Sequence, residues 1–265
     1  MEKYKLKVQN DIIYLFLLLF ISEVFNYLSE SAQLTVLIPI AVFGLILLET
    51  WFIRTFSLYS GRKISKYSDV IVRISLKERF FEYFILPAIF YLAILAFLYF
   101  NKHLLLGHVV LGISMCLFLV LFLNVKTSLN KLYKIGNVTR IIYDVICITI
   151  LYLLINIFVR VGLGQLLVLA LVFVTSLALL IFILRIHDKL GWYEMIMALL
   201  SALFISFITL VVYDLNIFVI PGITSLAFYL IISLWNVRFS GKTRLVDYLI
   251  PFLYVAIALT LILKL

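Results

Sequence analysis

Two ionisable side chains stand out because they lie inside strongly apolar stretches and belong to types that transfer protons. Glu23 falls near the end of one apolar run, and His108 falls near the start of another. A carboxylate and an imidazole brought together could act as an acid and base on a lipid. A charge in the bilayer interior costs about 2.5 to 3.5 kcal/mol on insertion scales, so such residues need partners or a function. This pair is the first candidate for chemistry.

Further polar residues fall at a similar depth in other apolar runs. A Pro-Gly pair at Pro221 and Gly222 lies among them and could free backbone carbonyls. We hypothesise a polar cavity that opens to the outer side of the membrane. The same groups could instead form ordinary hydrogen bonds between helices, worth about 0.6 kcal/mol each. The residues of this hypothetical cavity are Glu23, Asn26, His108, Asn156, Arg160, Gln165, Thr224 and Ser225.

A second set of charges lies at the opposite ends of the apolar runs. Such side chains can extend to water or pair with neighbours, so we interpret them as a solvated rim at the inner membrane face. Glu49 is the exception, since it lies about one helical turn inside Arg54. The rim residues are Glu49, Arg54, Glu82, Asp144, Glu194, Arg238 and Asp247.

Sequence patterns of common enzymes and metal sites are not found. The chain has no His-Glu-x-x-His, Gly-x-Ser-x-Gly, Walker, Gly-x-Gly-x-x-Gly or Asp-x-x-Asp pattern. Three histidines are few for a multi-histidine metal site, so we expect no metal and no cofactor. The net charge of +9 is explained below by membrane topology and gives no support for nucleic-acid binding.

The elements that must position these residues are transmembrane helices. Hydrophobic residues make up 66% of the chain, charged residues 13%, and the mean hydropathy is +1.22. The apolar runs are long enough for helices to cross a hydrocarbon core of about 30 Å. We predict an all-α, polytopic bundle that forms a single integral membrane domain over residues 1–265. The predicted spans are 12–28, 34–54, 82–100, 104–123, 141–159, 161–184, 192–213, 216–236 and 246–263.

The positions of Lys and Arg orient this bundle. With nine spans, all but three of the 22 basic residues fall on the same side as the N-terminus. Short cytoplasmic loops carry such an excess, so we predict the N-terminus inside and the C-terminus outside. We assign the protein to the cell membrane of a prokaryote. The three tryptophans, Trp51, Trp192 and Trp235, lie at predicted inner helix ends, where we expect them at the membrane interface.

The longest loop has a helical pattern of its own. Apolar residues between Ile64 and Ile74 recur at helical spacing, and basic residues fill the remaining arc. We predict a basic amphipathic helix over 58–81 that lies on the cytoplasmic surface and is attracted to anionic headgroups. A simple surface anchor and a partner-binding or lipid-sensing segment both fit this pattern.

One short segment occurs twice. Residues 77–87 read KERFFEYFILP, and residues 242–251 read KTRLVDYLIP. Their upstream helices also resemble each other, which suggests one helix followed by four hairpins, with the second and third helices duplicated as the eighth and ninth. Membrane physics alone could impose the same order of residue types. All four prolines lie inside predicted spans of these hairpins, where we expect kinks: Pro39, Pro87, Pro221 and Pro251.

Three functions from different classes remain open. The first is a non-enzymatic accessory or structural subunit that packs against a membrane protein partner. The second is a transporter-like or flippase-like protein with a polar site near the outer leaflet. The third is an intramembrane lipid-modifying enzyme that uses Glu23 and His108. A water-accessible cavity that joins the polar residues would favour transport or catalysis, and polar groups paired from helix to helix would favour the accessory role.

Overall fold

The structure, a computed structural model, describes residues 2–31, 33–59, 80–101, 103–130, 137–241 and 244–264. Within these ranges nine helices are long and apolar enough to cross a membrane, which confirms a multi-pass, all-α membrane protein. The helical elements are α1 (Glu2–Leu28), α2 (Leu34–Tyr59), η1 (Phe81–Ile85), α4 (Leu86–Phe100), α5 (Leu104–Asn130), α6 (Asn137–Arg160), α7 (Gln165–Ile186), α8 (Trp192–Val211), α9 (Val219–Phe239) and α10 (Leu245–Ile262).

The nine predicted spans coincide with the apolar spans of these helices to within four residues, whereas α1, α2 and α5 continue five to ten residues beyond the predicted bounds. The break at Arg160 is confirmed, since α6 ends at Arg160 and α7 begins at Gln165. Gly162 in this turn has a φ of 72°, a left-handed conformation that glycine adopts readily. Residues 60–79 of the predicted surface helix lie outside the described residues. The orientation of the N-terminus and the prokaryotic source stay predictions.

The chain divides into two compact units, Met1–Ile142 and Tyr143–Leu265. The boundary falls within the first turns of α6. Each unit is described by itself, and a single domain over the whole chain stays a prediction.

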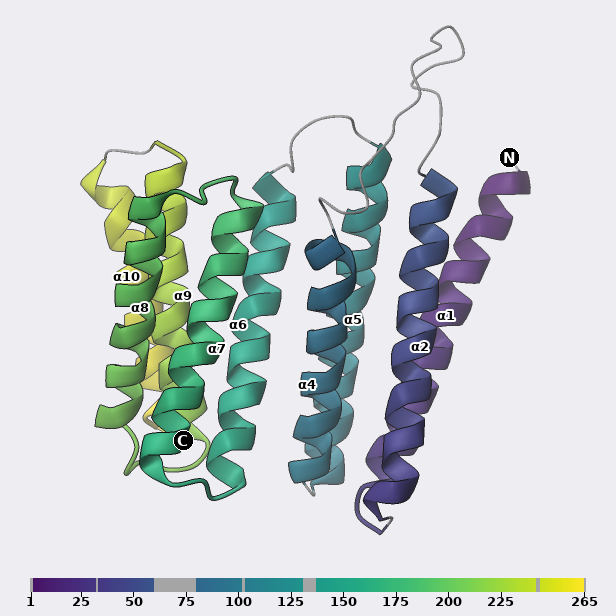
Figure 1. The fold of residues 1–265 in the computed structure, drawn as a ribbon, viewed down its shortest axis with the longest axis horizontal. Coiled ribbons are helices and arrows are strands. Elements are labelled where there is room, and N and C mark those ends of the chain that lie inside the picture. Colours follow the sequence, from purple (N-terminus) through teal and green to yellow (C-terminus); the bar gives the residue numbers. More distant parts are fainter. Residues whose placement is uncertain are drawn as a thin grey trace, which may run out of the picture. The chain divides into compact units, whose positions relative to one another are not determined.

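Helices α1, α2, α4 and α5 pack together in the first unit, as Figure 1 shows in purple to teal. An aromatic cluster holds one end of this unit. The Trp51 ring stacks on Phe122, with centroids 4.1 Å apart, and lies parallel to Tyr14 at 6.3 Å. Only 1% of Trp51 is exposed, so its ring packs between helices, and its position at the membrane interface stays a prediction. A ring of this size gives more packing contact between helices than any other side chain, which favours its burial.

The third span begins with a π-helical turn, η1. Its signature is the Leu86 N–H, which donates to the Phe81 carbonyl five residues earlier. Pro87 follows at once, and proline has no N–H to donate. The wider π turn therefore lies where the α-helical hydrogen-bond pattern is already interrupted.

The other three prolines lie in α-helices. Pro39 is inside α2 and Pro251 is inside α10, as predicted. Pro221, expected in the interior of its span, lies in the first turn of α9 because this helix begins at Val219 rather than at residue 216. A proline in a first turn removes an N–H that has no helical partner, so it costs little there.

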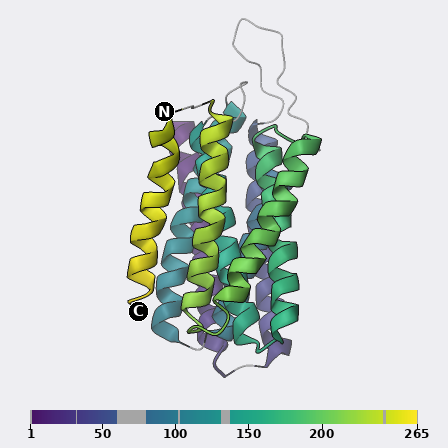
Figure 2. The same ribbon diagram turned by 90° about the vertical axis from the view of Figure 1, so that its left-hand side faces the viewer.

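In the second unit, α7 packs against α8, α8 against α9, and α9 against α10. Figure 2 shows α9 between α10, drawn in yellow, and the green helices. The buried stripe of α8 consists of Ala198, Ala202, Ile205 and Thr209, at spacings of three to four residues. Small residues at this spacing let neighbouring helices approach closely in a membrane.

Candidate functional site

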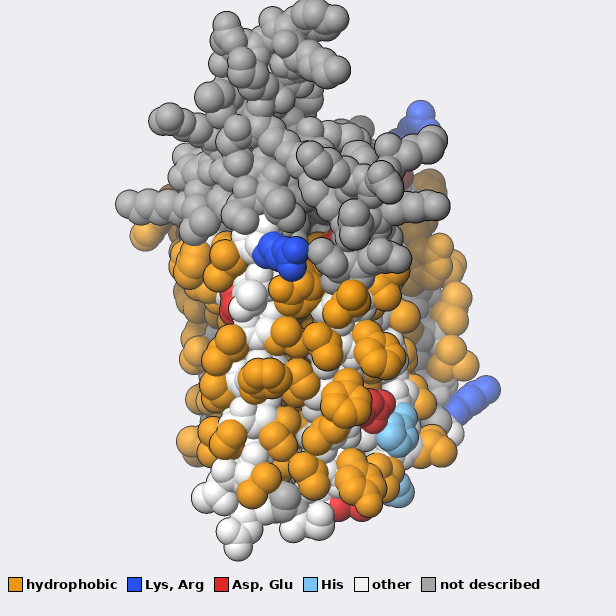
Figure 3. Space-filling view, turned by 90° about the vertical axis from the view of Figure 1, so that its right-hand side faces the viewer, with side chains coloured by type: hydrophobic (Ala, Val, Ile, Leu, Met, Phe, Trp, Pro, Cys, Tyr) orange, Lys and Arg blue, Asp and Glu red, His pale blue; other side chains and the backbone are white. Residues whose placement is uncertain are grey.

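Glu23 and His108 are in direct contact in the first unit. The Nδ1 atom of His108 lies 2.8 Å from Oε2 of Glu23, so α1 and α5 are joined by this pair. The Glu23 side chain is 34% exposed, and the His108 side chain is 54% exposed. Figure 3 shows an acidic side chain against a histidine ring, with hydrophobic side chains beside them. The pair is therefore accessible from the side of the bundle.

The depth of this pair follows from helix geometry. His108 lies four residues from the start of its span at Leu104, and Glu23 lies five residues from the end of its span at Leu28. At 1.5 Å per residue, both side chains start about 6 to 8 Å inside the apolar spans. An ionisable pair at this depth, partly exposed beside apolar side chains, is unusual and points to a function.

Asn26 lies one helical turn from Glu23 and is buried. It packs against Gly107 of α5, where a Cβ atom would meet the Asn26 amide oxygen at 2.5 Å. Gly107 therefore allows α1 and α5 to approach closely beside the Glu23–His108 pair. Nδ2 of Asn26 has no hydrogen-bond partner among the described residues.

In the second unit, Asn156 and Arg160 form a local pair at the end of α6. The Nε atom of Arg160 donates to Oδ1 of the buried Asn156 at 3.0 Å, and its guanidinium carbon lies 4.9 Å from the centre of the Phe218 ring. Gln165 begins α7 and is exposed. Arg160 is therefore held by a side chain of its own helix and by an aromatic ring near the start of α9.

Thr224 forms a hydrogen bond that joins α8 to α9 in their buried interface. Its Oγ1 lies 3.1 Å from Oγ1 of Thr209, and both residues are fully buried. Ser225 is also buried, and its hydroxyl has no hydrogen-bond partner among the described residues. Hydroxyl contacts of this kind are typical of packed membrane helices.

The residues of the hypothetical cavity thus divide between the units, with Glu23, Asn26 and His108 in the first and the other five in the second. Within the units the structure brings together Glu23 with His108, and Asn156 with Arg160. One cavity shared by all eight residues stays a prediction.

A buried cluster at the other end of the second unit was missed by the sequence analysis. Oδ2 of Asp144 accepts a 2.7 Å hydrogen bond from Nδ2 of Asn236, and Oδ1 lies 3.9 Å from Nε2 of His187. Asp144 and His187 are buried, so the expected solvated rim is wrong at Asp144. A buried carboxylate needs such partners, because its desolvation is otherwise costly. The sequence signal was that all three residues lie on the predicted inner side of the membrane, Asp144 near the start of its span and His187 and Asn236 near the ends of theirs.

The remaining rim residues fall into three groups by exposure. Arg54 and Arg238 are exposed and lie over tyrosine rings, at 5.8 Å from the Tyr14 centroid and 5.0 Å from the Tyr193 centroid. Glu82 is buried, which again corrects the solvated-rim interpretation. Three carboxylates are half-buried: Glu49, Glu194 and Asp247.

Glu194 and Asp247 occupy the first turns of α8 and α10, where a carboxylate is stabilised by the helix dipole. The Glu194 carboxylate folds back over Gly191, which leaves no room for a Cβ atom there. Beside it, a pocket of about 20 Å³ is lined by Leu184, Tyr193, Glu194, Met197, Trp235, Arg238 and Phe239.

The two His–carboxylate pairs differ in what they could do. The Asp144–His187 pair is buried, and its 3.9 Å separation is too long for a hydrogen bond, so it offers a substrate little access. The Glu23–His108 pair is hydrogen-bonded and accessible, so it could exchange a proton or bind a polar group. Among the described residues, no group of three or more His, Cys, Asp or Glu is placed to hold a metal ion.

Comparisons of the chain with protein-family models, with curated proteins and with solved structures found no match.

Proposed function

We propose that this chain is a non-enzymatic accessory subunit that packs against a larger membrane assembly. The observation that carries the proposal is the exposure of α10, in which Pro251 alone is buried among 18 residues. Lipid tails are as apolar as leucine, so membrane helices are held together by packing rather than by burial from water. Helix α10 packs mainly on α9, and another protein's transmembrane helix would fit the surface that remains.

The pairing of polar side chains supports the same role. Thr209 and Thr224 join α8 to α9, and Glu23 and His108 join α1 to α5. Arg160 is bonded to Asn156 on its own helix. Polar groups used in this way stabilise a bundle and do not require a substrate.

A second candidate is a transporter-like or flippase-like protein. It is favoured by the partial exposure of Glu23 and His108 at membrane depth, where a polar substrate group could reach them. Catalysis on a lipid, with this pair as acid and base, ranks third. For catalysis we expect Glu23→Gln to abolish activity without loss of expression, and an unchanged activity would exclude the enzyme.

We also propose that the N-terminus is cytoplasmic and that the basic segment 58–81 interacts with anionic headgroups. Nineteen of the 22 Lys and Arg residues support this orientation. A reporter enzyme fused after Leu265 should be active outside the cytoplasm, and a cytoplasmic C-terminus would overturn the orientation.

Site-specific photocrosslinking in native membranes tests the accessory role. A benzophenone amino acid replaces Leu253 or Leu261, which are exposed on α10. We expect one crosslinked product of defined mass that contains this chain and a second, different membrane protein. The matched control places the same amino acid at Leu203 or Phe207, which are exposed on α8.

The control decides how the crosslinks are interpreted. Lipid adducts alone, equal from α10 and α8, would contradict the accessory role. A product of twice the chain's mass would also contradict it, because the occupant of the α10 surface would then be a second copy.

A further inference from the structure

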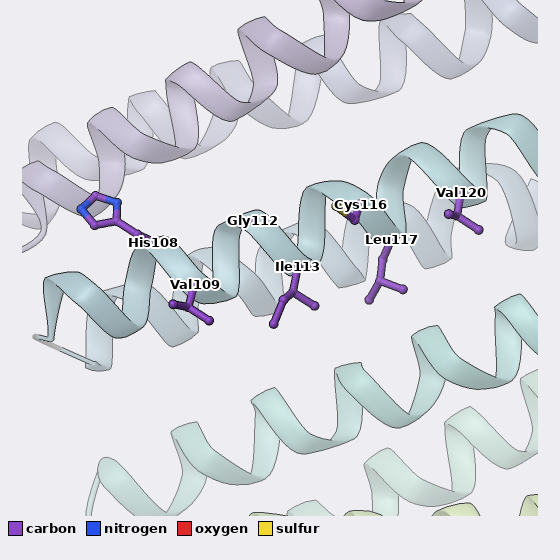
Figure 4. A pocket seen from close by; sticks show the side chains of 7 residues that line it. All are labelled: His108, Val109, Gly112, Ile113, Cys116, Leu117 and Val120. Carbon is purple, nitrogen blue, oxygen red and sulfur yellow. The ribbon is translucent and has the colours of Figure 1, made fainter.

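An apolar groove runs along α5 from the Glu23–His108 pair. It has a volume of about 460 Å³ and is lined by His108, Val109, Gly112, Ile113, Cys116, Leu117 and Val120 (Figure 4). His108 forms one end, and Val120 lies 12 residues further along the helix. At 1.5 Å per residue the lining residues extend about 18 Å along the helix, and the groove is shallow and open on its outer side.

Two small residues make the depression. A Cβ atom on Gly112 would meet no atom within 4 Å, so nothing in the structure fills the space above it. Cys116, one turn further, is exposed. In Figure 4 the side chains of Val109, Ile113 and Leu117 project along one side of the helix, and the His108 ring points away from them towards α1. The groove is therefore apolar along its length, and the Glu23–His108 pair lies beside one end of it.

The chemistry of the polar end defines the group it would bind. When the Glu23 carboxylate is ionised it accepts hydrogen bonds only, and the 2.8 Å contact then requires a proton on Nδ1 of His108. Nε2 is then an acceptor in the neutral ring and a donor in the imidazolium. A hydroxyl group both donates and accepts, so it satisfies Nε2 in either state. The carboxylate disfavours an anionic head group such as a phosphate.

We propose that this groove binds a neutral membrane amphiphile that has a hydroxyl head group and a linear apolar tail. The hydroxyl bonds to the exposed side of the Glu23–His108 pair, and the tail lies along Gly112 and Cys116 towards Val120. This occupant matches the groove's length, its apolar lining and the depth of its polar end. A partner helix would cover the apolar lining but would leave the ionisable pair without a polar group of its own.

Photolabelling of the full-length protein in phosphatidylcholine vesicles tests this proposal. The probe is a 16-carbon alkanol that carries a diazirine near the middle of its chain, and the labelled peptides are mapped by mass spectrometry. We expect labelling to concentrate on residues 109–120. The control probe is the same chain without its hydroxyl group, and it should label α5 about fivefold less, the effect of one hydrogen bond.

Two variants separate the tail from the head group. Gly112→Leu fills the groove without a predicted clash and should remove alkanol labelling of α5. His108→Leu removes the head-group contact and should reduce alkanol labelling to the level of the control probe. Labelling of the exposed α8 residues Leu203 and Phe207 should not change in either variant.

Three results would overturn the proposal. Equal labelling of α5 and α8 would show that the groove is ordinary lipid-facing surface. Equal labelling by the two probes would exclude head-group recognition. Protection of residues 109–120 from both probes in native membranes, combined with a protein crosslink there, would assign the groove to a partner helix. The proposal does not depend on the accessory role, because that role is tested on α10.

Discussion

Two hairpins of this protein share a sequence pattern and differ in burial. In the first, α2 leads to η1 and α4, and 61% of the span Phe81–Phe100 is buried. In the second, α9 leads to α10, and 6% of the span Leu245–Ile262 is buried. The shared pattern of basic residues, a carboxylate and a proline lies at the start of both spans. It does not set how many neighbours the helix has.

The two repeated segments also differ by one residue. KERFFEYFILP has 11 residues and KTRLVDYLIP has ten, so the carboxylate is five residues from the proline in one copy and four in the other. The π turn of η1 lies between Phe81 and Ile85, and no such turn interrupts α10. A single-residue insertion in a helix is accommodated by a π turn, which keeps both flanks in register. This supports the hypothesis that the hairpins arose by duplication.

A third difference lies at the ends of the upstream helices. Trp51-Phe52 in α2 corresponds to Trp235-Asn236 in α9. Phe52 packs on Phe122, with centroids 6.1 Å apart, whereas Asn236 donates to the Asp144 carboxylate. The matching positions thus join each upstream helix to a helix outside its hairpin, α2 to α5 by an aromatic contact and α9 to α6 by a polar contact.

The largest difference between the hairpins should come from truncating the residue three positions after the proline. Phe90 is fully buried and lies 4.8 Å from Phe118, whereas the matching Tyr254 is exposed. Phe90→Ala should reduce the free energy of unfolding by about 3 to 5 kcal/mol, because it leaves a cavity. Tyr254→Ala should change it by less than about 0.5 kcal/mol.

Reversible unfolding in mixed dodecylmaltoside and SDS micelles measures both variants. Similar losses for Phe90→Ala and Tyr254→Ala would show that α10 is packed as tightly as α4, and the comparison would fail.

The buried polar contact of the second hairpin should have the next largest effect. Asn236→Leu removes the hydrogen bond to a buried carboxylate and should cost about 2 kcal/mol in the same unfolding assay. The double variant Asp144→Leu/Asn236→Leu removes the carboxylate as well, so it should recover part of that loss. A double variant less stable than Asn236→Leu would indicate that Asp144 is stabilised mainly by other groups.

The number of spans, their helical type and their approximate bounds were predictable, because the length of each apolar run and the charges that flank it can be read from the local sequence. The break at Arg160 followed from length alone. Burial of individual polar residues was not predictable, since it depends on which helices become neighbours. Asp144 was assigned to solvent because it is at a helix end, yet Asn236, 92 positions away, makes it a core residue. Contact between Glu23 and His108, 85 positions apart, was not encoded in any local pattern either.

Glycines at the helix contacts of the two hairpins offer a smaller test. A Cβ atom on Gly44 of α2 would run into the Tyr91 hydroxyl of α4, whereas one on Gly222 of α9 would meet the flexible end of Ile262 at 3.1 Å. Gly44→Ala should therefore cost about 1 kcal/mol of unfolding free energy through overpacking. Adding Tyr91→Phe should restore part of it, because the clashing oxygen is gone while the ring carbon Cζ stays 2.8 Å from the new Cβ. Gly222→Ala should be close to neutral, and a loss as large as that of Gly44→Ala would contradict the difference.

The smallest effect is expected from making the two repeats equal in length. One Leu inserted between Ile250 and Pro251 gives α10 the spacing of the first copy. Because Pro251 alone is buried in α10, a π turn or a rotation of the remaining helix loses few contacts, and we expect a change below about 0.5 kcal/mol. Deleting the buried Leu86 is the reverse change and should leave α4 in register, at a cost of about 2 kcal/mol for the lost side chain. A deletion of Ala88, beyond the π turn, is the control: it rotates the rest of α4 by about 100° and should prevent folding. If ΔLeu86 is as damaging as ΔAla88, the π turn does not absorb the extra residue and the argument for duplication is lost.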